Sequence, residues 1–171
     1  RLQGPMCPGF PCRAGQGRHV GSHPFAEQPM SIEDPLIAIL VVSDRAARGE
    51  YEDKGGPAAE GWIARVVTSG VRTLRRIVPD GRDSVAAAIR DLADNAGADL
   101  ILVTGGTGPA PRDETPEALD AVIDKRLAGF GEAMRLASLA EVPTAILSRQ
   151  DAGIRGKSLI ITLPGKPAAI S

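Results

Sequence analysis

The run Gly-Gly-Thr-Gly at positions 105–108, followed closely by Arg112 and Asp113, combines the kinds of group that bind a phosphate. Glycine has no Cβ, so the backbone can take positive φ there and bring its N–H groups close to an anion. Arg112 adds a guanidinium group, and Asp113 adds a carboxylate that could hold a divalent cation. The segment therefore predicts an anion-binding loop. Taken alone, it is equally consistent with a tight strand-to-helix connection in which glycine serves only the geometry.

This segment does not match the usual nucleotide-binding motifs. Pro109 and Pro111 stand where the helix of a G-x-G-x-x-G dinucleotide motif should begin, and no Gly-Lys-Ser/Thr follows, as a P-loop would require. The usual nucleotide-binding motifs are therefore absent from this segment.

The expected domain, residues 34–171, contains no histidine and no cysteine, which restricts its chemistry. Thiol nucleophiles and imidazole bases are excluded there. Catalysis in this domain would rest on carboxylates, Arg and Lys, hydroxyl groups, backbone N–H groups and an added metal ion.

Residues 1–33 differ in composition from the rest and are expected to be a disordered or non-native leader. They are rich in glycine and proline and show no hydrophobic periodicity. Met30 could be the natural start, in which case residues 1–29 would not be native. They hold Cys7, Cys12, His19 and His23. The spacing of these residues does not fit a standard zinc finger, and the segment lacks the apolar region of a secretory signal.

The composition of the 171-residue chain favours one α/β domain. A hydrophobic share of 43% is enough for one good core, and a net charge of −1 excludes a strongly basic nucleic-acid binder. No apolar run approaches the length that spans a bilayer. Since only 3% of the residues are aromatic, the core must be built from Ala, Val, Ile and Leu, which suits a doubly wound sheet.

The hydrophobic pattern predicts a parallel sheet. The unbroken apolar runs at 35–42 and 100–103 are typical of strands covered on both faces, and we place the second at the centre of the sheet. Residues 71–78 alternate between apolar and basic side chains and predict a strand nearer the sheet edge. A polar loop at 43–56 and a helix at 58–68 separate the first two strands. A second helix, capped by Asp83 or Ser84 and closed by Gly97, precedes the central strand.

Beyond the glycine-rich loop the pattern is less regular. Thr115 is expected to cap a helix, and helical stretches are predicted at 118–127 and 130–140. We then expect a strand at 145–147, a polar loop at 150–157 and a strand or hairpin at 159–163. The last expected element is a helix that opens at Pro164 and stops at Ser171.

Ligands of open parallel sheets bind outside the carboxyl ends of the strands, and polar residues follow each predicted strand end here. These residues are Ser43 and Asp44, Asp80, the segment 105–113, Ser148 and Arg149, and Pro164 and Gly165. Each has a simpler interpretation: Asp80 as a turn residue, Asp44 as an Asx-turn acceptor, and Asp113 as a helix cap. Their gathering at one edge favours a binding site.

These residues belong to longer motifs, which occur in one order along the chain. The motifs are Ser43-Asp44-Arg45, Tyr51-Glu52-Asp53-Lys54-Gly55, Thr104-Gly105-Gly106-Thr107-Gly108-Pro109, Arg112-Asp113-x-Thr115-Pro116, Gly129-Phe130-Gly131-Glu132-x-Met134-Arg135, Pro143-Thr144-Ala145-Ile146-Leu147-Ser148-Arg149 and Leu163-Pro164-Gly165-Lys166-Pro167. Together they resemble the molybdopterin adenylyltransferases, the MogA family, which is related to the G domain of gephyrin. The resemblance covers about residues 36–171; the leader has no counterpart in the family, and the family's C-terminal helix is largely missing.

The resemblance implies a three-layer α/β/α domain with a mostly parallel sheet, in a cytoplasmic homotrimer. It implies transfer of AMP from Mg-ATP to the terminal phosphate of molybdopterin, with release of pyrophosphate, in molybdenum cofactor biosynthesis. A molybdenum insertase would act downstream. The attacking group would be a phosphate oxygen that is already anionic, so the reaction needs positioning and charge neutralisation rather than a histidine or cysteine.

The resemblance also implies roles for particular residues. Asp80 and Asp113 match the aspartates implicated in catalysis and are the expected Mg²⁺ ligands. The expected substrate- and nucleotide-binding residues are Ser43, Asp44, Gly105, Gly106, Thr107, Gly108, Pro164 and Gly165, to which the predicted edge adds Ser148 and Arg149.

Two other functions are weighed against these motifs. One is a non-catalytic pterin-binding or scaffold module, which would have no need to keep both Asp80 and Asp113. The other is a relative with the same glycine-rich core, such as a nicotinamide-nucleotide deamidase-associated domain or a molybdenum insertase. Such a relative is not expected to carry the motifs at 43–45 and 51–54.

Overall fold

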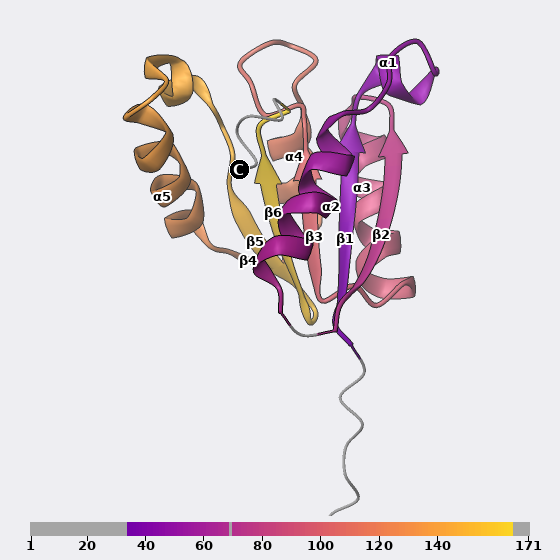
Figure 1. Ribbon diagram of the computed structural model, residues 1–171. Helices are drawn as coiled ribbons and strands as arrows, with labels where there is room; N and C mark the ends of the chain where they lie inside the picture. Colours follow the sequence, from indigo (N-terminus) through magenta and orange to yellow (C-terminus); the bar gives the residue numbers. More distant parts are fainter. Residues whose placement is uncertain (1–33, 69, 166–171) are drawn as a thin grey trace, which may run out of the picture. The chain divides into compact units, whose positions relative to one another are not determined.

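A computed structural model describes residues 34–68 and 70–165 (Figure 1). The predicted leader and the predicted helix after Pro164 lie almost entirely outside these residues. The strands are β1 Leu36–Val42, β2 Arg72–Val78, β3 Leu100–Thr104, β4 Lys125–Arg126, β5 Ala152–Arg155 and β6 Ser158–Leu163. The helices are α1 Asp44–Ala47, α2 Gly55–Val66, α3 Arg82–Arg90 with a π-helical continuation η1 Asp91–Asn95, α4 Thr115–Asp120, α5 Ala128–Leu139 and the 3₁₀ helix η2 Pro143–Leu147.

The six strands form one sheet in the order β2-β1-β3-β6-β5-β4. The first four pair in parallel, whereas β5 pairs antiparallel with both β6 and β4. The predicted mostly parallel sheet is therefore confirmed. The central place predicted for residues 100–103 is confirmed as well, because β3 lies between β1 and β6.

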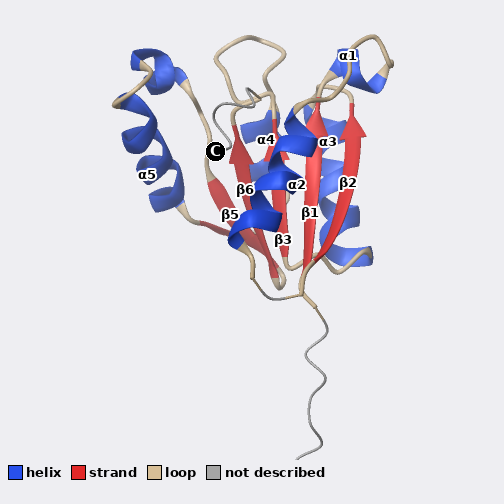
Figure 2. Ribbon diagram, in the orientation of Figure 1, coloured by secondary structure: helices blue, strands red, loops and turns tan. Residues whose placement is uncertain are grey.

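Helices cover both faces of the sheet, as Figure 2 shows by colour. Alternate residues of β1 point to opposite faces: Ala38 and Leu40 join a core with α3 and α4, whereas Ile39 joins a core with α2. Both faces of β1 are therefore buried, as its unbroken apolar run predicts. The predicted three-layer α/β/α architecture is confirmed.

Strand β2 lies at the edge of the sheet, as its mixed apolar and basic pattern predicts. Arg75 forms an ion pair with Glu60 at 3.6 Å, and Arg76 forms one with Asp91 at 2.6 Å. Charged side chains on an edge strand hinder its pairing with another chain.

The segment predicted as a polar loop after β1 contains helical turns. Helix α1 begins after Ser43, whose Oγ accepts from Ala46 N at 3.3 Å. Helix α2 begins at Gly55 rather than at 58, because Asp53 Oδ1 accepts from Gly55 N at 2.9 Å and from Gly56 N at 3.0 Å. Side-chain acceptors thus supply partners for N–H groups that would otherwise have none.

Two predicted helix caps are wrong. Gly81, rather than Asp83 or Ser84, is the N-cap of α3, and Ser84 Oγ donates to Pro79 O at 2.9 Å. Glu114 rather than Thr115 is the N-cap of α4; Thr115 is the first residue of the helix, and its Oγ1 donates to Gly105 O at 2.8 Å. The glycine-rich loop therefore uses the hydroxyl group that was expected to cap the helix.

The chain between α4 and β6 differs most from the prediction. The helical stretch predicted at 118–127 ends at Asp120, because Asp124 N and Leu127 N donate to carbonyl groups of β5 instead of continuing the helix. The predicted strand at 145–147 is the helix η2, in which Ile146 is 68% exposed. The expected loop at 150–157 contains β5, so the strand position beside β6 is already taken. The alternative of a hairpin ending in the 159–163 strand is confirmed.

In the part of the chain that the structure describes, no helix has the length and apolarity needed to cross a membrane.

Candidate functional site

The carboxyl ends of the parallel strands meet at one edge of the sheet, the upper edge in Figure 1. Ser43 follows β1, Asp80 lies just beyond β2, Gly105 follows β3 and Pro164 follows β6. The predicted gathering of these residues at one edge is confirmed. Ser148 reaches this edge from the end of η2 and not, as predicted, from the end of a strand.

The glycine-rich loop takes a backbone path that only glycine allows. Gly105 has φ +109°, and a Cβ there would lie 2.3 Å from Val42 O. Gly106 has φ +64°, and its Cβ would lie 2.4 Å from Thr115 Oγ1. Hydrogen bonds hold the loop in place: Gly105 N donates to Leu163 O at 3.1 Å and Thr115 N donates to Gly106 O at 3.1 Å. The loop is thus anchored to both β6 and α4.

The N–H groups of residues 106–108 are available for a ligand. Gly105 N is used by Leu163, but the N–H groups of Gly106, Thr107 and Gly108 donate no hydrogen bond to any residue that the structure describes. Consecutive N–H groups without a partner form a concave site for an anion. The main chain therefore has the character expected of a phosphate-binding loop.

This loop borders a hollow of about 610 Å³, here called the wide hollow. The predicted site residues that line it are Gly106, Thr107, Gly108, Asp113, Ser148, Pro164 and Gly165. Arg112, whose guanidinium group the sequence placed in the anion-binding segment, also lines the wide hollow, whereas sequence reasoning left out Ser138, Thr144 and Gln150. Gln150 is 2% exposed, and its Oε1 accepts from Ser148 Oγ at 3.2 Å. Only the fold shows that these polar side chains share a cavity.

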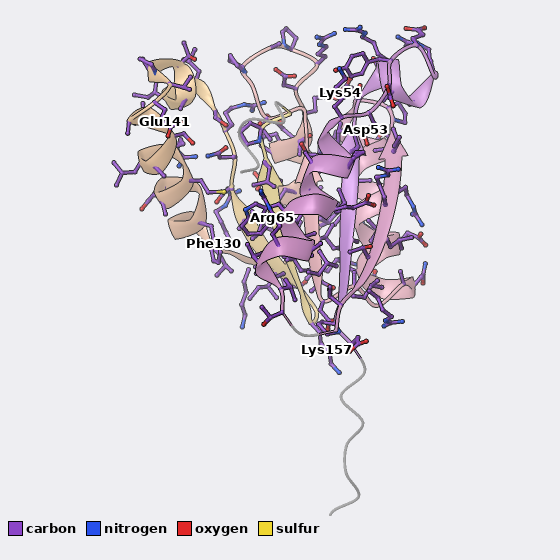
Figure 3. The ribbon with its side chains drawn as sticks, viewed as in Figure 1. Asp53, Lys54, Arg65, Phe130, Glu141 and Lys157 are labelled. Atoms are coloured by element: carbon purple, nitrogen blue, oxygen red, sulfur yellow. The ribbon has the colours of Figure 1, made fainter. Side chains whose placement is uncertain are left out.

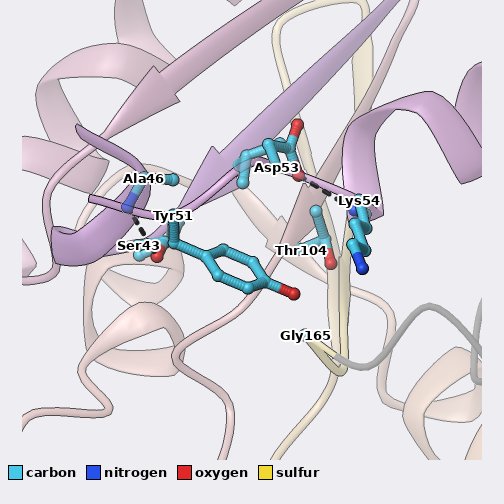
Figure 4. A pocket seen from close by; sticks show the side chains of 10 residues that line it. Ser43, Ala46, Tyr51, Asp53, Lys54, Thr104 and Gly165 are labelled. Carbon is cyan, nitrogen blue, oxygen red and sulfur yellow. Dashed lines mark hydrogen bonds between the residues drawn. The ribbon is translucent and has the colours of Figure 1, made fainter. Parts of the chain in front are cut away.

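A smaller hollow of about 130 Å³ lies next to the wide one. Ser43, Tyr51, Asp53, Lys54, Thr104 and Gly165 are among the residues that line it (Figure 4). Gly165 lines both hollows, so they meet at the residue that follows Pro164. Lys54 supplies a cation here, and Figure 3 shows it beside Asp53. The motif at 51–54 was the sequence signal for Tyr51, Asp53 and Lys54, although these three residues were not assigned to the site.

Asp44 and Asp80 are joined by two hydrogen bonds, each from the backbone N–H of one residue to the carboxylate of the other. Asp44 N donates to Asp80 Oδ2 at 3.0 Å, and Asp80 N donates to Asp44 Oδ1 at 3.1 Å. Asp80 lines a separate hollow of about 510 Å³, together with Glu114. Of the two aspartates expected to be catalytic, only Asp113 lines the wide hollow.

Asp113 is held by its own loop. Its Oδ2 accepts from Ala110 N at 3.1 Å, and its N–H donates to Ala110 O at 2.9 Å. No group of three or more His, Cys, Asp or Glu side chains positioned to hold a metal occurs among residues 34–68 and 70–165. A cation at this site would therefore need oxygen atoms from a substrate and from water.

Arg149 faces the loop rather than the wide hollow. Its Nε donates to Gly108 O at 3.0 Å, its Nη2 donates to Asp113 O, and its Nη1 pairs with Glu117. The hydrogen bond from Arg149 and its positive charge lower the pKa of Glu117. Arg149 lines a hollow of about 370 Å³, together with Glu117 and Asp113, on this other side of the loop.

Comparison with known proteins finds matches over the described domain. Residues 38–171 match the family described as a probable molybdopterin binding domain. A protein named molybdopterin adenylyltransferase from Helicobacter pylori (strain ATCC 700392 / 26695) is 51% identical over 134 residues, which are 78% of this chain and 76% of that protein. The protein of the same name from Escherichia coli (strain K12) is 47% identical over 134 residues, which are 78% of this chain and 69% of that protein.

Solved structures agree with the sequence matches. The molybdopterin biosynthesis Mog protein from Mycobacterium ulcerans superposes with a TM-score of 0.71 at 39% identity. The match covers 80% of this chain and 87% of that one.

Proposed function

The chain belongs to the molybdopterin-binding domain family, and we propose on this basis that it is a molybdopterin adenylyltransferase of molybdenum cofactor biosynthesis. It transfers AMP from Mg-ATP to the terminal phosphate of molybdopterin and yields adenylyl-molybdopterin and pyrophosphate. The observation that carries this proposal is the N–H groups of residues 106–108, which line a hollow of about 610 Å³ without a partner in the described chain.

The chemistry needs no histidine or cysteine. A phosphate oxygen of molybdopterin, already anionic, forms a bond to the α-phosphorus of ATP, and the bond from that phosphorus to the β-phosphate oxygen breaks. Pyrophosphate leaves with the electron pair. The protein contributes in-line positioning and charge neutralisation, and the groups available for this are the loop N–H groups, Arg112 and Lys54.

Magnesium fits the acceptor atoms of the site. Mg²⁺ in nucleotide-dependent enzymes is commonly held by one or two carboxylates, with phosphate oxygens and water completing its shell. Asp113, the carboxylate that lines the wide hollow, would hold it, with Asp80 as the proposed second carboxylate on the adjoining loop. The bound cation would neutralise the phosphate charge that increases in the transition state.

The two adjoining hollows suit a reaction with two substrates. We propose that Ser43, Asp44, Pro164 and Gly165 bind substrate together with the glycine-rich loop, and that Ser148 does so from the end of η2. Gly165, which lines both hollows, lies where the two ligands would meet.

We further propose a cytoplasmic homotrimer that passes its product to a molybdenum insertase. The apolar side chains exposed on α5 and η2, such as Leu136 and Ile146, support an association between copies, because such surface is costly to leave in water.

The proposal is tested by following radiolabelled AMP from ATP to purified molybdopterin, with Mg²⁺ as the variable. We expect transfer that is lost when Mg²⁺ is chelated and restored when it is added back. Molybdopterin binding without any transfer would instead favour the scaffold module.

A further inference from the structure

Arg149 contacts the glycine-rich loop through both its main chain and its side chain. Its backbone N donates to Thr107 O at 2.8 Å, and its Nε donates to Gly108 O at 3.0 Å. Its Nη2 donates to Asp113 O. One residue thus binds three carbonyl groups of the loop, each of them 36 or more positions away from it in the chain.

The main-chain bond from Arg149 to Thr107 determines which way a loop N–H points. In a trans peptide, the carbonyl of one residue and the N–H of the next point in opposite directions, and no described peptide bond is cis. Because Thr107 O points at Arg149, the N–H of Gly108 points away from Arg149. Gly108 lines the wide hollow, and Arg149 does not. The N–H of Gly108, which has no partner among the described residues, is therefore presented on the side of the wide hollow.

Glu117 holds the guanidinium group from the other side. Its Oε1 accepts from Arg149 Nη1, and both residues line the hollow behind the loop. A planar guanidinium group can donate along several edges at once, which a lysine ammonium group cannot reproduce at fixed geometry. Helix α4, through Glu117, thus fixes the side chain that fixes the loop.

We propose that Arg149 is a positioning residue. Its main-chain N–H holds Thr107 O, and its guanidinium group holds Gly108 O and Asp113 O, so that the loop presents its N–H groups and the Asp113 carboxylate to the phosphates. This proposal rests on the proposed function. It differs from direct substrate binding by Arg149 because the guanidinium donors are already directed at loop carbonyl groups and at Glu117.

The test compares Arg149→Lys with Arg155→Lys. Arg155 is a matched control: its Nη1 donates to Val122 O at 2.9 Å and its Nη2 pairs with Asp94 at 2.6 Å, away from the loop. Arg149→Lys keeps the main-chain bond to Thr107 O and removes the guanidinium bonds to Gly108 O and Asp113 O. We expect it to lower kcat for AMP transfer by about 100-fold, with KM for both substrates within about threefold of wild type. Arg155→Lys should keep both constants near their wild-type values.

Hydrogen exchange supplies a readout that does not depend on activity. Amides of residues 105–114 should exchange faster in Arg149→Lys than in the wild type and in Arg155→Lys, at equal global stability. If the wild-type protein transfers no AMP, the proposed function fails. Faster exchange in Arg149→Lys would still support the positioning role of Arg149, and unchanged exchange would overturn it.

Two results would overturn the proposal directly. One is a kcat for Arg149→Lys within about threefold of wild type; the other is a loss confined to KM, which would place the side chain on the substrate. If Arg149→Lys does not fold, Glu117→Gln takes its place. A fall in kcat of about tenfold at unchanged KM supports the positioning role of Arg149, since the charge-assisted hydrogen bond between Glu117 and Arg149 is weakened. Wild-type values of kcat and KM overturn it.

Discussion

Asp113 and Asp80 are the carboxylates of the proposed chemistry, and their surroundings differ. Asp113 lines the wide hollow together with Gly106, Thr107 and Gly108, whereas Asp80 lines a separate hollow and accepts from Asp44 N. A hydrogen bond to a backbone N–H is also what a plain turn residue would make. Substitution by Asn separates these roles, because Asn keeps the shape and the acceptor oxygen but removes the charge.

We expect Asp113→Asn to slow single-turnover AMP transfer by roughly 100-fold to 1000-fold, with little change in pterin affinity or melting temperature. The reason is that the lost charge acts mainly in the transition state. Asp124→Asn is the control, since Asp124 Oδ2 also accepts from a backbone N–H, that of Gly156 at 2.7 Å. Transfer at the wild-type rate would remove Asp113 from the catalytic group, and lost pterin binding would move it to the substrate pocket.

Asp80→Asn is expected to slow transfer in the same way, although the amide oxygen can still accept from Asp44 N. Rapid-quench measurement of transfer and calorimetric measurement of stability would be made on the same preparation. Retained stability with slowed transfer supports a role in the reaction. Unchanged transfer would leave Asp80 with the structural role of joining the loops after β1 and β2.

Gly106 and Gly97 form a matched pair for the glycine-rich loop. Gly106 has φ +64° and a blocked Cβ position, whereas Gly97 has φ +67° and no atom of the described residues within 4 Å of its Cβ position. Gly97→Ala should lower the free energy of unfolding by about 1 kcal/mol from backbone strain alone. Gly106→Ala should lower it further and slow AMP transfer, because the new methyl group displaces Thr115 Oγ1. Equal losses in the two variants, measured by urea unfolding, would contradict this.

At the scale of elements, α4 and the segment after η2 are joined by the ion pair between Glu117 and Arg149. The pKa of Glu117 lies below its usual 4.5 because Arg149 donates to the carboxylate. The unfolded state therefore binds a proton more readily than the folded state. The stabilisation from this pair is fully present above about pH 4.5 and is lost as the pH falls through the folded-state value.

We predict that Glu117→Gln lowers the melting temperature at pH 7, and that this difference from the wild type shrinks as the pH falls below about 4.5. The loss at pH 7 should correspond to less than about 1 kcal/mol, since both side chains are partly exposed to solvent. Differential scanning calorimetry of both proteins across this range checks the sign. A difference that grew as the pH fell would contradict the assignment.

At the scale of the whole molecule, exposed apolar side chains gather on α5 and η2. Leu136 is 74% exposed and Ile146 is 68% exposed, although both belong to helices that pack against each other. Burying such side chains favours association. In the proposed homotrimer, this surface would lie between copies.

We predict that the protein has a mass in light scattering of three times the 17.8 kDa chain, and that Leu136→Lys with Ile146→Lys lowers it. Val66→Lys, which changes an exposed apolar residue on α2, is the control and should leave the mass unchanged. A wild-type protein with the mass of one chain would refute the trimer. A trimer that survives both lysines would place its interface elsewhere.

Local sequence patterns were sufficient to predict the strands that are buried on both faces. The unbroken apolar run of β1 and the run that begins β3 predict covered parallel strands, because only such strands tolerate apolar residues at every position. Parallel strands in turn bring their carboxyl ends to one edge, so the meeting of Ser43, Asp80 and Gly105 followed from the sequence. The absence of histidine and cysteine from residues 34–171 likewise limited the chemistry before any fold was known.

The conformation of short or exposed segments, and the partners of their polar side chains, were determined by the tertiary structure. Three apolar residues at 145–147 fit a strand equally well, and they form a 3₁₀ helix because β5 already pairs with β6. The partners of Arg149 and the separation of Asp80 from Asp113 also came only from the fold. A hydrophobic pattern indicates which side of an element is buried. A polar side chain forms hydrogen bonds with the donors and acceptors that the folded chain brings within about 3 Å of it, and the pattern does not contain that information.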